Sequence, residues 1–535
     1  GSGSGTAVPL TVNNALMANG QYPFTFNTIA YANVLRHCTI DQSAHLVTAS
    51  ASATLNFANS VFAQVTNLTS GPASLSGSYN GFSPSTSSKF GSTSTRWICD
   101  YPPFQSGGGG GCYLANESGF RARGTASVPS TLLNALKTRT THPPIAFPTF
   151  MHVSENLRLG PRVPRYGSGA PDLGYHYDAL DYTIAHVVLG GGSTLAVQPG
   201  TAVGIRQDLV IVGYDPPGQP VLMWTSYGLE AWEGSKIISS GTPNNPINYA
   251  AINMVQERQT GAGGVLGFVP WYLPKFEQLP PPIMDFRFSN FHMTPESYHF
   301  AGGYLEDFEF VTSRSCVMSL GLRDCNLRGG HINLGKGLDW WTAAGSISWF
   351  NNSFERIGIN LDPNWVDLGD PVAYADIGLQ ARNNLFRGGR LRLVPFRAGA
   401  WMFKDNLFDK EEFIQDVLHP LTHDYNAYWQ LLTSELRWGG TKRLATNMTH
   451  DRVLTSAPWY ETGPLGDRYL GSSPLYDANK RGSRSPAAAG LWHYTTQRVQ
   501  TKDSDLGGNV VIGRHYVATA SYNNAQLKDA DATYP

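Results

Sequence analysis

A short phrase recurs between Phe286 and Phe408, and each copy closes on a large apolar residue. The copies read FSNF, EDFEF, DCNL, NNSF, NNLF and DNLF, and they close at Phe291, Phe310, Leu327, Phe354, Phe386 and Phe408. Successive closing residues lie between 17 and 32 positions apart. Repeats of about 20 to 30 residues are typical of stacked coils, because a single coil cannot bury its apolar face alone. The recurrence therefore predicts a solenoid.

The residues within each phrase favour strands over helices. Apolar positions fall at i and i+2, and Gly and Asn flank them, which suits a short, half-buried strand. The 535 residues include 57 Gly and 34 Pro, and 12% are aromatic, a mixture that favours strands joined by turns. We predict an all-β solenoid with long loops between strands, and short helices only near residues 130–138 and 409–417.

One polar position recurs two residues before the closing apolar residue. Neighbouring strands lie about 4.8 Å apart, so side chains at this position would stack in successive coils. We expect a structural ladder in which amides bond to each other and to the backbone, and its members are Cys325, Asn352, Asn384 and Asn406.

A longer repeat relates the two ends of the chain. LRHCTI, LNFANSVF and YNGF near the start match ARNNLF, WMFKDNLF and YNAY, and all three pairs have an offset of 346 residues. Two further matches, YLANESGF with YLGSSPLY and GYHY with GRHY, follow at offsets of 356 and 339. We therefore expect part of one unit followed by a complete second unit, within a longer tandem protein.

The second unit begins and ends with segments that resemble a known class. STLAVQPGTAVGI (Ser193–Ile205) and GLEAWEGSKIISSGTPNNPINYAAI (Gly228–Ile252) resemble the entry coils of right-handed parallel β-helix modules in large, repetitive, secreted or surface proteins of bacteria. The segment from Gly463 to Gln497 and the IGRHY string resemble the tails of such proteins. This resemblance implies a right-handed parallel β-helix and an extracellular or cell-surface location.

These matches set the expected boundaries. Residues 1–5, GSGSG, look like a linker or an engineered scar. The expected segments are 6–182 for the C-terminal part of the first unit, 183–522 for the second unit and 523–535 for a terminal tail. Within the second unit we expect entry coils over 183–267, a Pro-rich extended link over 268–285, the main stack over 286–430 and a tail over 431–522.

Charge and cysteine content exclude several classes of function. The formal net charge is −1, which gives no field for nucleic acid or an anionic membrane. No apolar run approaches the 18 residues that a membrane-spanning helix needs. Cys99 and Cys112 bracket a Gly-rich loop and allow a disulfide, but no Cys/His spacing indicates a metal site. We expect no cofactor.

Catalysis would need acidic groups from adjacent coils on one face. Hydrolases of glycosides pair two carboxylates, and the candidates are Asp307, Glu309, Asp324 and Glu355. A polysaccharide lyase would need a Lys or Arg base beside an acidic calcium site, and no dense Asp cluster accompanies the arginines near the phrases, such as Arg323 and Arg328. Asp324 also aligns with Asn351, Asn383 and Asp405, which favours a structural column of polar residues.

Aromatic residues suggest a binding role. Trp340 and Trp341 lie in a long excursion between coils, and exposed indole faces stack on sugar rings. They are the candidate ligand-binding residues, although packing against the solenoid is the alternative. We expect a non-catalytic structural or adhesive module that assembles with neighbouring units or with itself, with polysaccharide as a further partner. A carbohydrate-active enzyme, either hydrolase or lyase, and a glycan-binding module remain the alternatives.

Overall fold

The computed structural model describes residues 9–83, 90–99, 102–215, 219–225, 228–257, 264–270, 279–301, 316–334, 343–361, 376–393, 401–415, 421–431, 449–499 and 501–518. The chain divides into two compact units. Unit 1 comprises residues 1–146, 162–183 and 255–259, and unit 2 comprises 147–161, 184–254 and 260–535. Unit 2 thus includes residues 147–161, which precede the boundary expected at residue 183.

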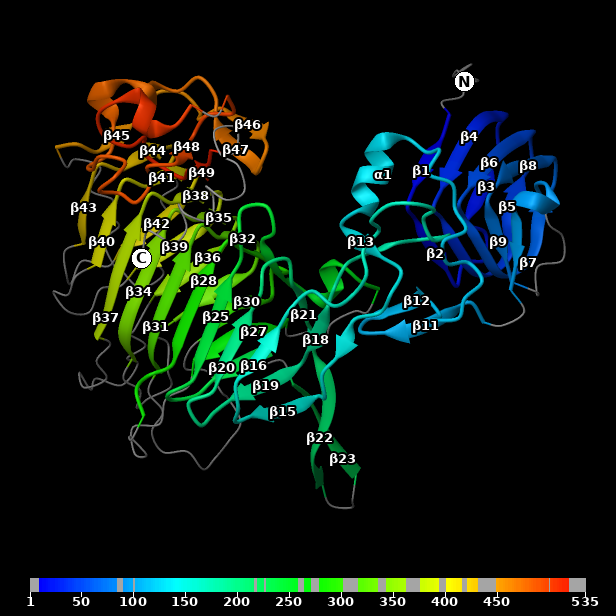
Figure 1. The fold of residues 1–535 in the computed structure, drawn as a ribbon, viewed down its shortest axis with the longest axis horizontal. Helices are drawn as coiled ribbons and strands as arrows, with labels where there is room; N and C mark the ends of the chain where they lie inside the picture. The colour runs from blue at the N-terminus through cyan, green and yellow to red at the C-terminus, as the bar shows by residue number, and fades with distance from the viewer. Residues whose placement is uncertain are drawn as a thin grey trace. The chain divides into compact units, whose positions relative to one another are not determined.

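Unit 2 is a right-handed parallel β-helix. Each coil contributes one strand to each of three parallel sheets (Figure 1). The first sheet contains β15 (Phe150–Val153), β19 (His186–Leu189), β24 (Gly228–Ala231), β27 (Leu266–Pro270), β30 (Tyr298–Ala301), β33 (His331–Asn333), β36 (Gly358–Leu361), β39 (Arg390–Leu393) and β42 (Glu412–Gln415). The second sheet contains β16 (Leu157–Leu159), β20 (Thr194–Val197), β25 (Lys236–Ser240), β28 (Ile283–Arg287), β31 (Cys316–Arg323), β34 (Ala343–Phe350), β37 (Asp376–Arg382), β40 (Trp401–Lys404) and β43 (Thr422–Asp424).

The third sheet includes the strands that contain the closing apolar residues. Its strands within unit 2 are, in order, β21 (Ala202–Ile205), β26 (Ile247–Ala251), β29 (Ser289–His292), β32 (Asn326–Arg328), β35 (Ser353–Glu355), β38 (Leu385–Arg387), β41 (Leu407–Asp409), β44 (Ala427–Trp429) and β45 (Arg452–Val453). A hairpin of β22 (Asp208–Asp215) and β23 (Gln219–Thr225) is inserted before β24. The tail adds β46 (Tyr460–Gly463), β47 (Gly466–Leu470), β48 (Tyr494–Thr495), β49 (Tyr516–Val517) and the short 3₁₀ helices η4 (Pro474–Tyr476), η5 (Ala478–Lys480) and η6 (Asp503–Leu506).

The closing apolar residues form an aromatic stack inside unit 2. The rings of Phe354, Phe386, Phe408 and Tyr428 lie nearly parallel, with successive centroids 4.9, 5.0 and 5.2 Å apart. This spacing is close to that of the strands that carry them, so one ring per coil continues the stack. The recurring phrase therefore encodes the core of the solenoid.

A two-residue bend separates the second sheet from the third in the five coils from β31 and β32 to β43 and β44. Its first residue has a positive φ, between 55° and 63°, at Asp324, Asn351, Asn383, Asp405 and Tyr425. Asn and Asp tolerate this left-handed conformation better than other residues with a side chain. The backbone conformation thus favours Asn and Asp at this place, although Tyr425 also adopts it.

The second bend residue carries the ladder. The Asn384 amide oxygen accepts the backbone N–H of Asn352 at 2.8 Å, and its Nδ2 donates to the carbonyl of Trp349 at 2.9 Å. Asn406 bonds Asn384 and Ala381 in the same way at 3.0 and 2.9 Å. Each amide therefore closes the bend of the preceding coil. The series begins at the N–H of Cys325 and continues beyond the predicted members to Asn426, whose N–H the Asp451 carboxylate accepts.

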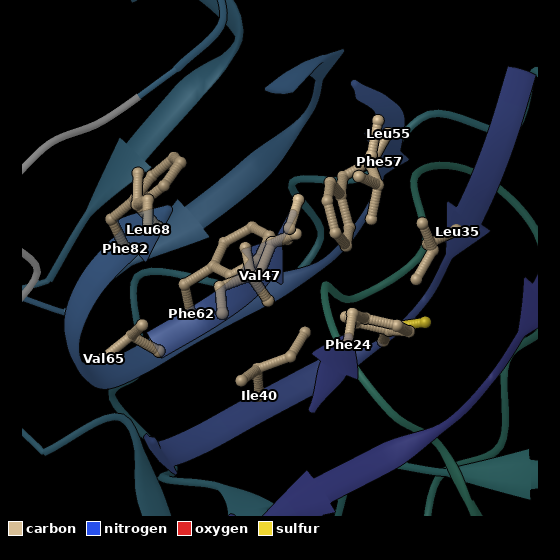
Figure 2. Close-up of a cluster of buried hydrophobic side chains, with 14 residues drawn as sticks. Phe24, Leu35, Ile40, Val47, Leu55, Phe57, Phe62, Val65, Leu68 and Phe82 are labelled. Atoms are coloured by element: carbon tan, nitrogen blue, oxygen red, sulfur yellow. The ribbon is translucent and has the colours of Figure 1, made fainter. Parts of the chain in front are cut away.

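Unit 1 contains two parallel sheets built on the same principle. One contains β1 (Thr11–Asn13), β4 (Ala30–Arg36), β6 (Ala53–Ala58) and β8 (Ala73–Ser78), and the other contains β2 (Leu16–Ala18), β5 (Thr39–Ala49), β7 (Val61–Ser70), β9 (Asn80–Phe82) and β10 (Arg96–Ile98), with β3 (Phe24–Phe26) paired to β5. Figure 2 shows the apolar cluster between them, including Phe24, Leu55 and Phe62. Asn80 donates to the Phe57 carbonyl and accepts from the Ser60 N–H, as the ladder does in unit 2.

The remaining elements of unit 1 are short. They are the strands β11 (Phe104–Gly107), β12 (Gly110–Leu114), β13 (Arg139–Thr140), β14 (Ile145–Ala146), β17 (Tyr177–Asp178) and β18 (Tyr182–Ile184), the 3₁₀ helix η1 (Thr93–Thr95) and the helix α1 (Ser130–Leu136). The predicted helix at residues 130–138 is confirmed by α1. The one predicted at 409–417 is wrong over its described part, because β41 ends and β42 runs there.

The Pro-rich link is shorter than predicted. Phe268 is fully buried in β27, and residues 283–285 belong to β28, which pairs with β25 and β31. Residues 271–278 lie outside the described residues. The strands on both sides of the prolines therefore belong to the regular coils, since the side chains of Phe268 and Met284 are both buried in the core.

We expect Asn384→Ala to destabilise the chain by about 3 kcal/mol, because it leaves the buried N–H of Asn352 and carbonyl of Trp349 without their partners. Urea unfolding measures the change. The control is Asn56→Ala, since exposed Asn56 bonds only the Ser76 hydroxyl, and its effect should stay within about 0.5 kcal/mol. Equal losses in the two variants would contradict the structural role of the ladder.

Candidate functional site

The first bend residue of selected coils holds the closing segment of each unit. In unit 2 the Asn351 amide donates to the carbonyl of His515 at 2.9 Å and accepts its N–H at 2.6 Å. In unit 1 the Asn14 amide makes the same pair of bonds with His176, at 2.9 and 2.8 Å. Both histidines are buried. They belong to the GYHY and GRHY strings, so the repeated string serves to dock the tail on a bend.

The first bend residue of another coil also holds the tail in each unit. Asp405 accepts the N–H and the hydroxyl of Ser483 at 2.6 and 2.7 Å, and Asn59 in unit 1 bonds the backbone of Thr125 in both directions at 2.8 Å. The tails also contain equivalent tyrosine pairs. Tyr469 stacks on Tyr516 and Tyr113 on Tyr177, each with ring centroids 4.1 Å apart. The polar residues that the sequence places at the bends therefore hold the tail of each unit through hydrogen bonds.

A groove lies beside this column, on the outer face of the second sheet of unit 2. Its volume is about 530 Å³, within the range of sites that bind small molecules. The floor consists of residues from β28, β31, β34 and β37, and the tail segment 484–490 forms a wall. Arg484 reaches the floor from this wall, where it donates to the side-chain oxygen of Asn383 at 3.3 Å.

The residues just before the bends form a row, called here the basic row, whose central members Arg323, Phe350 and Arg382 line the groove. In register across adjacent strands they are Arg287, Arg323, Phe350, Arg382 and Lys404. All five side chains are half-buried. The guanidinium of Arg323 lies 5.1 Å from the centre of the Phe350 ring, which is a favourable cation–π distance. The row thus places cations on neighbouring coils on both sides of one aromatic ring.

A second row runs parallel to the first, two residues earlier in each strand. It consists of Asp285, Gly321, Ser348 and Gln380, paired in register, and is called here the hydrogen-bonding row. Asp285, Ser348 and Gln380 are exposed. A Cβ at Gly321 would lie 2.8 Å from Oδ1 of Asp285, so the glycine leaves room for that carboxylate.

Positive charge exceeds negative charge around the groove. Arg323, Arg382 and Arg484 line the groove together with one carboxylate, that of Asp285. Asp324 and Asp405 are buried behind it, 3.4 Å from Arg323 and 3.8 Å from Arg484. Burial lowers the pKa of Arg484, and repulsion from Arg382 lowers it further. Burial raises the pKa of Asp285, although Arg287 and Arg323 oppose this. The groove therefore favours a ligand that brings negative charge.

The two described acidic candidates are both held in buried contacts. Asp324 is 4% exposed, and it accepts from Asn351 at 2.6 Å and from the Tyr494 hydroxyl at 3.0 Å. Glu355 is also 4% exposed and pairs with Arg468, with Nε 2.7 Å from Oε1. The structure does not bring these two carboxylates together around a cleft. Asp307, Glu309, Trp340 and Trp341 lie outside the described residues.

The four cysteines whose side chains the structure describes, Cys38, Cys99, Cys112 and Cys325, are buried. Cys112 is a free thiol, so the structure does not contain the disulfide that the sequence allows between Cys99 and Cys112. The two residues pack in different apolar clusters, Cys99 beside Val61 and Leu114, and Cys112 beside Tyr177. Burial raises the pKa of Cys112 to about 12, which keeps it a neutral thiol.

Within the described ranges, no group of three or more His, Cys, Asp or Glu side chains is placed to hold a metal ion. None of the helices in the described part of the chain has the length and apolar character to cross a membrane.

The recurring phrases do not by themselves predict the groove. Its signal in the sequence is the residue directly before each bend, which is Arg, Arg, Phe, Arg and Lys in successive coils. The wall residue Arg484 lies about a hundred residues away in sequence from Arg382, so no local spacing connects the two. No family model, curated protein or solved structure matches the chain.

The buried histidines of unit 1 predict a loss of stability in acid. The rings of His37 and His176 lie 5.1 Å apart. Burial lowers the pKa of both histidines, to about 4 for His176, and the two rings repel each other when charged. At His176 the Asp172 carboxylate raises the pKa and the Arg139 guanidinium lowers it. An unfolded histidine has a pKa of about 6.5. The neutral pair therefore stabilises unit 1 fully above about pH 6.5, and this stability is lost as the pH falls towards 4.

His176 alone would account for a loss of about 3 kcal/mol between neutral pH and pH 4. Proteolysis in urea, with unit 1 peptides followed by mass spectrometry, measures it. In His37→Asn the loss of stability should be smaller, because one of the two titrating histidines is removed. The asparagine should be tolerated, since Asn383 occupies the equivalent bend in unit 2. Unit 1 stability that does not change between pH 7 and pH 4.5 would contradict this account.

Proposed function

We propose that this chain is a non-catalytic adhesive segment of a larger secreted or cell-surface bacterial protein, and that it binds a glycan in the groove of unit 2. The observation that carries the proposal is the groove itself. It combines an exposed row of hydrogen-bonding side chains with a basic row that includes the ring of Phe350. Hydroxyl-rich ligands need both dense hydrogen bonding and an apolar face.

The lack of catalysis in the proposal rests on the acidic candidates. A glycosidase needs two carboxylates that reach the scissile bond from opposite sides. Asp324 and Glu355 are buried and engaged with Asn351, Tyr494 and Arg468. Asp285 is the carboxylate that lines the groove among the described residues. One carboxylate beside several arginines suits binding better than two-carboxylate hydrolysis.

The larger architecture supports a structural context for this binding. Both units place the same tail motif on the same bends, through Asn14 and Asn59 in unit 1 and Asn351 and Asp405 in unit 2. Repeated solenoid units are well suited to extended surface proteins, since each unit adds length along one axis. End-to-end assembly with neighbouring units is part of the proposal.

A glycan array followed by a turnover assay tests the proposed function. We expect the intact chain to retain glycans, and we expect Gln380→Ala together with Ser348→Ala to weaken retention, because these exposed side chains line the groove. The same glycans should show neither new reducing ends nor unsaturated products after incubation. Turnover would refute the non-catalytic role, and an array without any retained glycan would refute the binding role. The control is Asn56→Ala in unit 1.

A further inference from the structure

The basic row has an arrangement that parallel strands do not favour by themselves. Arg287 and Arg323 are direct neighbours on β28 and β31, and Arg382 and Lys404 are direct neighbours on β37 and β40. Like charges directly opposite on adjacent strands destabilise a sheet. Asp324 offsets this for the first pair, because its carboxylate lies 3.8 Å from Arg287 and 3.4 Å from Arg323. Arg382 donates to the sulfur of Met402, which is a weak acceptor, and it also attracts the buried Asp405 carboxylate. An anionic ligand would further offset the repulsion between Arg382 and Lys404.

Unit 1 shows that the fold does not require all of these cations. The positions that precede its bends carry Asn13, Arg36, Ala58 and Ser78, and the tail residue matching Arg484 is Ala126. Its tail nevertheless docks through the same bonds to Asn14 and Asn59. Arg36 matches Arg382, whereas the other three positions are uncharged, so the cations at Lys404 and Arg484 are additions to a scaffold that forms without them.

The geometry of the two rows points to the shape of the ligand. Residues in each row are about 4.8 Å apart along the coil axis, because each comes from a neighbouring strand. A chain crossing the strands would meet cations along one edge and the exposed groups Ser348 and Gln380 along the other. Such a ligand has carboxylates on one side, hydroxyls on the other, and extended length.

We propose that the groove binds a linear acidic polysaccharide, a polyuronate, whose carboxylates face the basic row and whose chain runs along the axis of the coil. This inference rests on the proposed glycan-binding function and names its ligand class. Nucleic acid fits less well, because phosphates would face the Asp285 carboxylate within the groove and because the net charge of the chain is −1. Acidic groups on a chain rich in hydroxyls match both rows.

Calorimetric titration with polygalacturonate and polymannuronate tests the inference, and each polymer with its carboxyl groups reduced to alcohols provides the neutral comparison. We expect the acidic polymers to bind and the reduced ones to bind much more weakly, with affinity falling as salt is added. Arg382→Gln should weaken binding about tenfold, since a charge-assisted hydrogen bond is lost. Arg36→Gln, the matched position in unit 1, should leave binding unchanged, and urea unfolding confirms that both variants are folded.

The outcomes separate this inference from the proposed function. If acidic and reduced polymers bind equally and Arg382→Gln has no effect, while Gln380→Ala weakens both, the glycan site stands and the polyuronate assignment is overturned. Equal losses in Arg382→Gln and Arg36→Gln would also overturn it, since the charge would then act non-specifically. Preference for a single-stranded DNA oligonucleotide over both polyuronates would assign the groove to a different class of polymer. If no polysaccharide binds at all, the proposed function itself fails.

Discussion

One side-chain amide per coil determines whether this chain can turn from one sheet to the next. The bend exposes a backbone N–H and a carbonyl that no strand can pair, and the amide of the following coil satisfies both, as Asn384 does for Asn352 and Trp349. Buried polar groups without partners would cost about 1–3 kcal/mol each. The requirement passes from coil to coil, so the bends and the aromatic stack beside them remain in register.

Three consecutive residues at the bend have three different structural roles. In the coil of β37 and β38, Arg382 points outward into the groove, Asn383 takes the left-handed conformation and accepts from the tail residue Arg484, and Asn384 enters the ladder. Stability, docking of the tail and the candidate binding surface are therefore fixed by adjacent positions. A shift of one residue would exchange all three roles, because successive side chains at the end of a strand face different sides.

The extent to which the sequence predicts the structure follows from this division. The ladder and the core are periodic, so repeated phrases were sufficient to predict the sheets and the positions of Asn352 and Asn406. The groove depends on register between strands whose loops differ in length and on Arg484, brought in by the distant tail. No local pattern encodes that approach. The polar column at Asp324 and Asp405 was predicted as structural, but its partners in the tail could not be inferred from spacing.

Comparison of the two units separates what the fold needs from what has been added to it. Substitutions at the bends keep the hydrogen bonds: Asn59 in unit 1 and Asp405 in unit 2 both hold the tail backbone. Substitutions one residue earlier need not preserve chemistry, since Ala58 stands where unit 2 has Lys404, although Arg36 matches Arg382. Positions that form the scaffold are thus restricted by buried polar groups, whereas the outward row is restricted only by what it contacts. A solenoid built in this way can change its surface charge unit by unit while the bends, the stack and the docked tail remain the same.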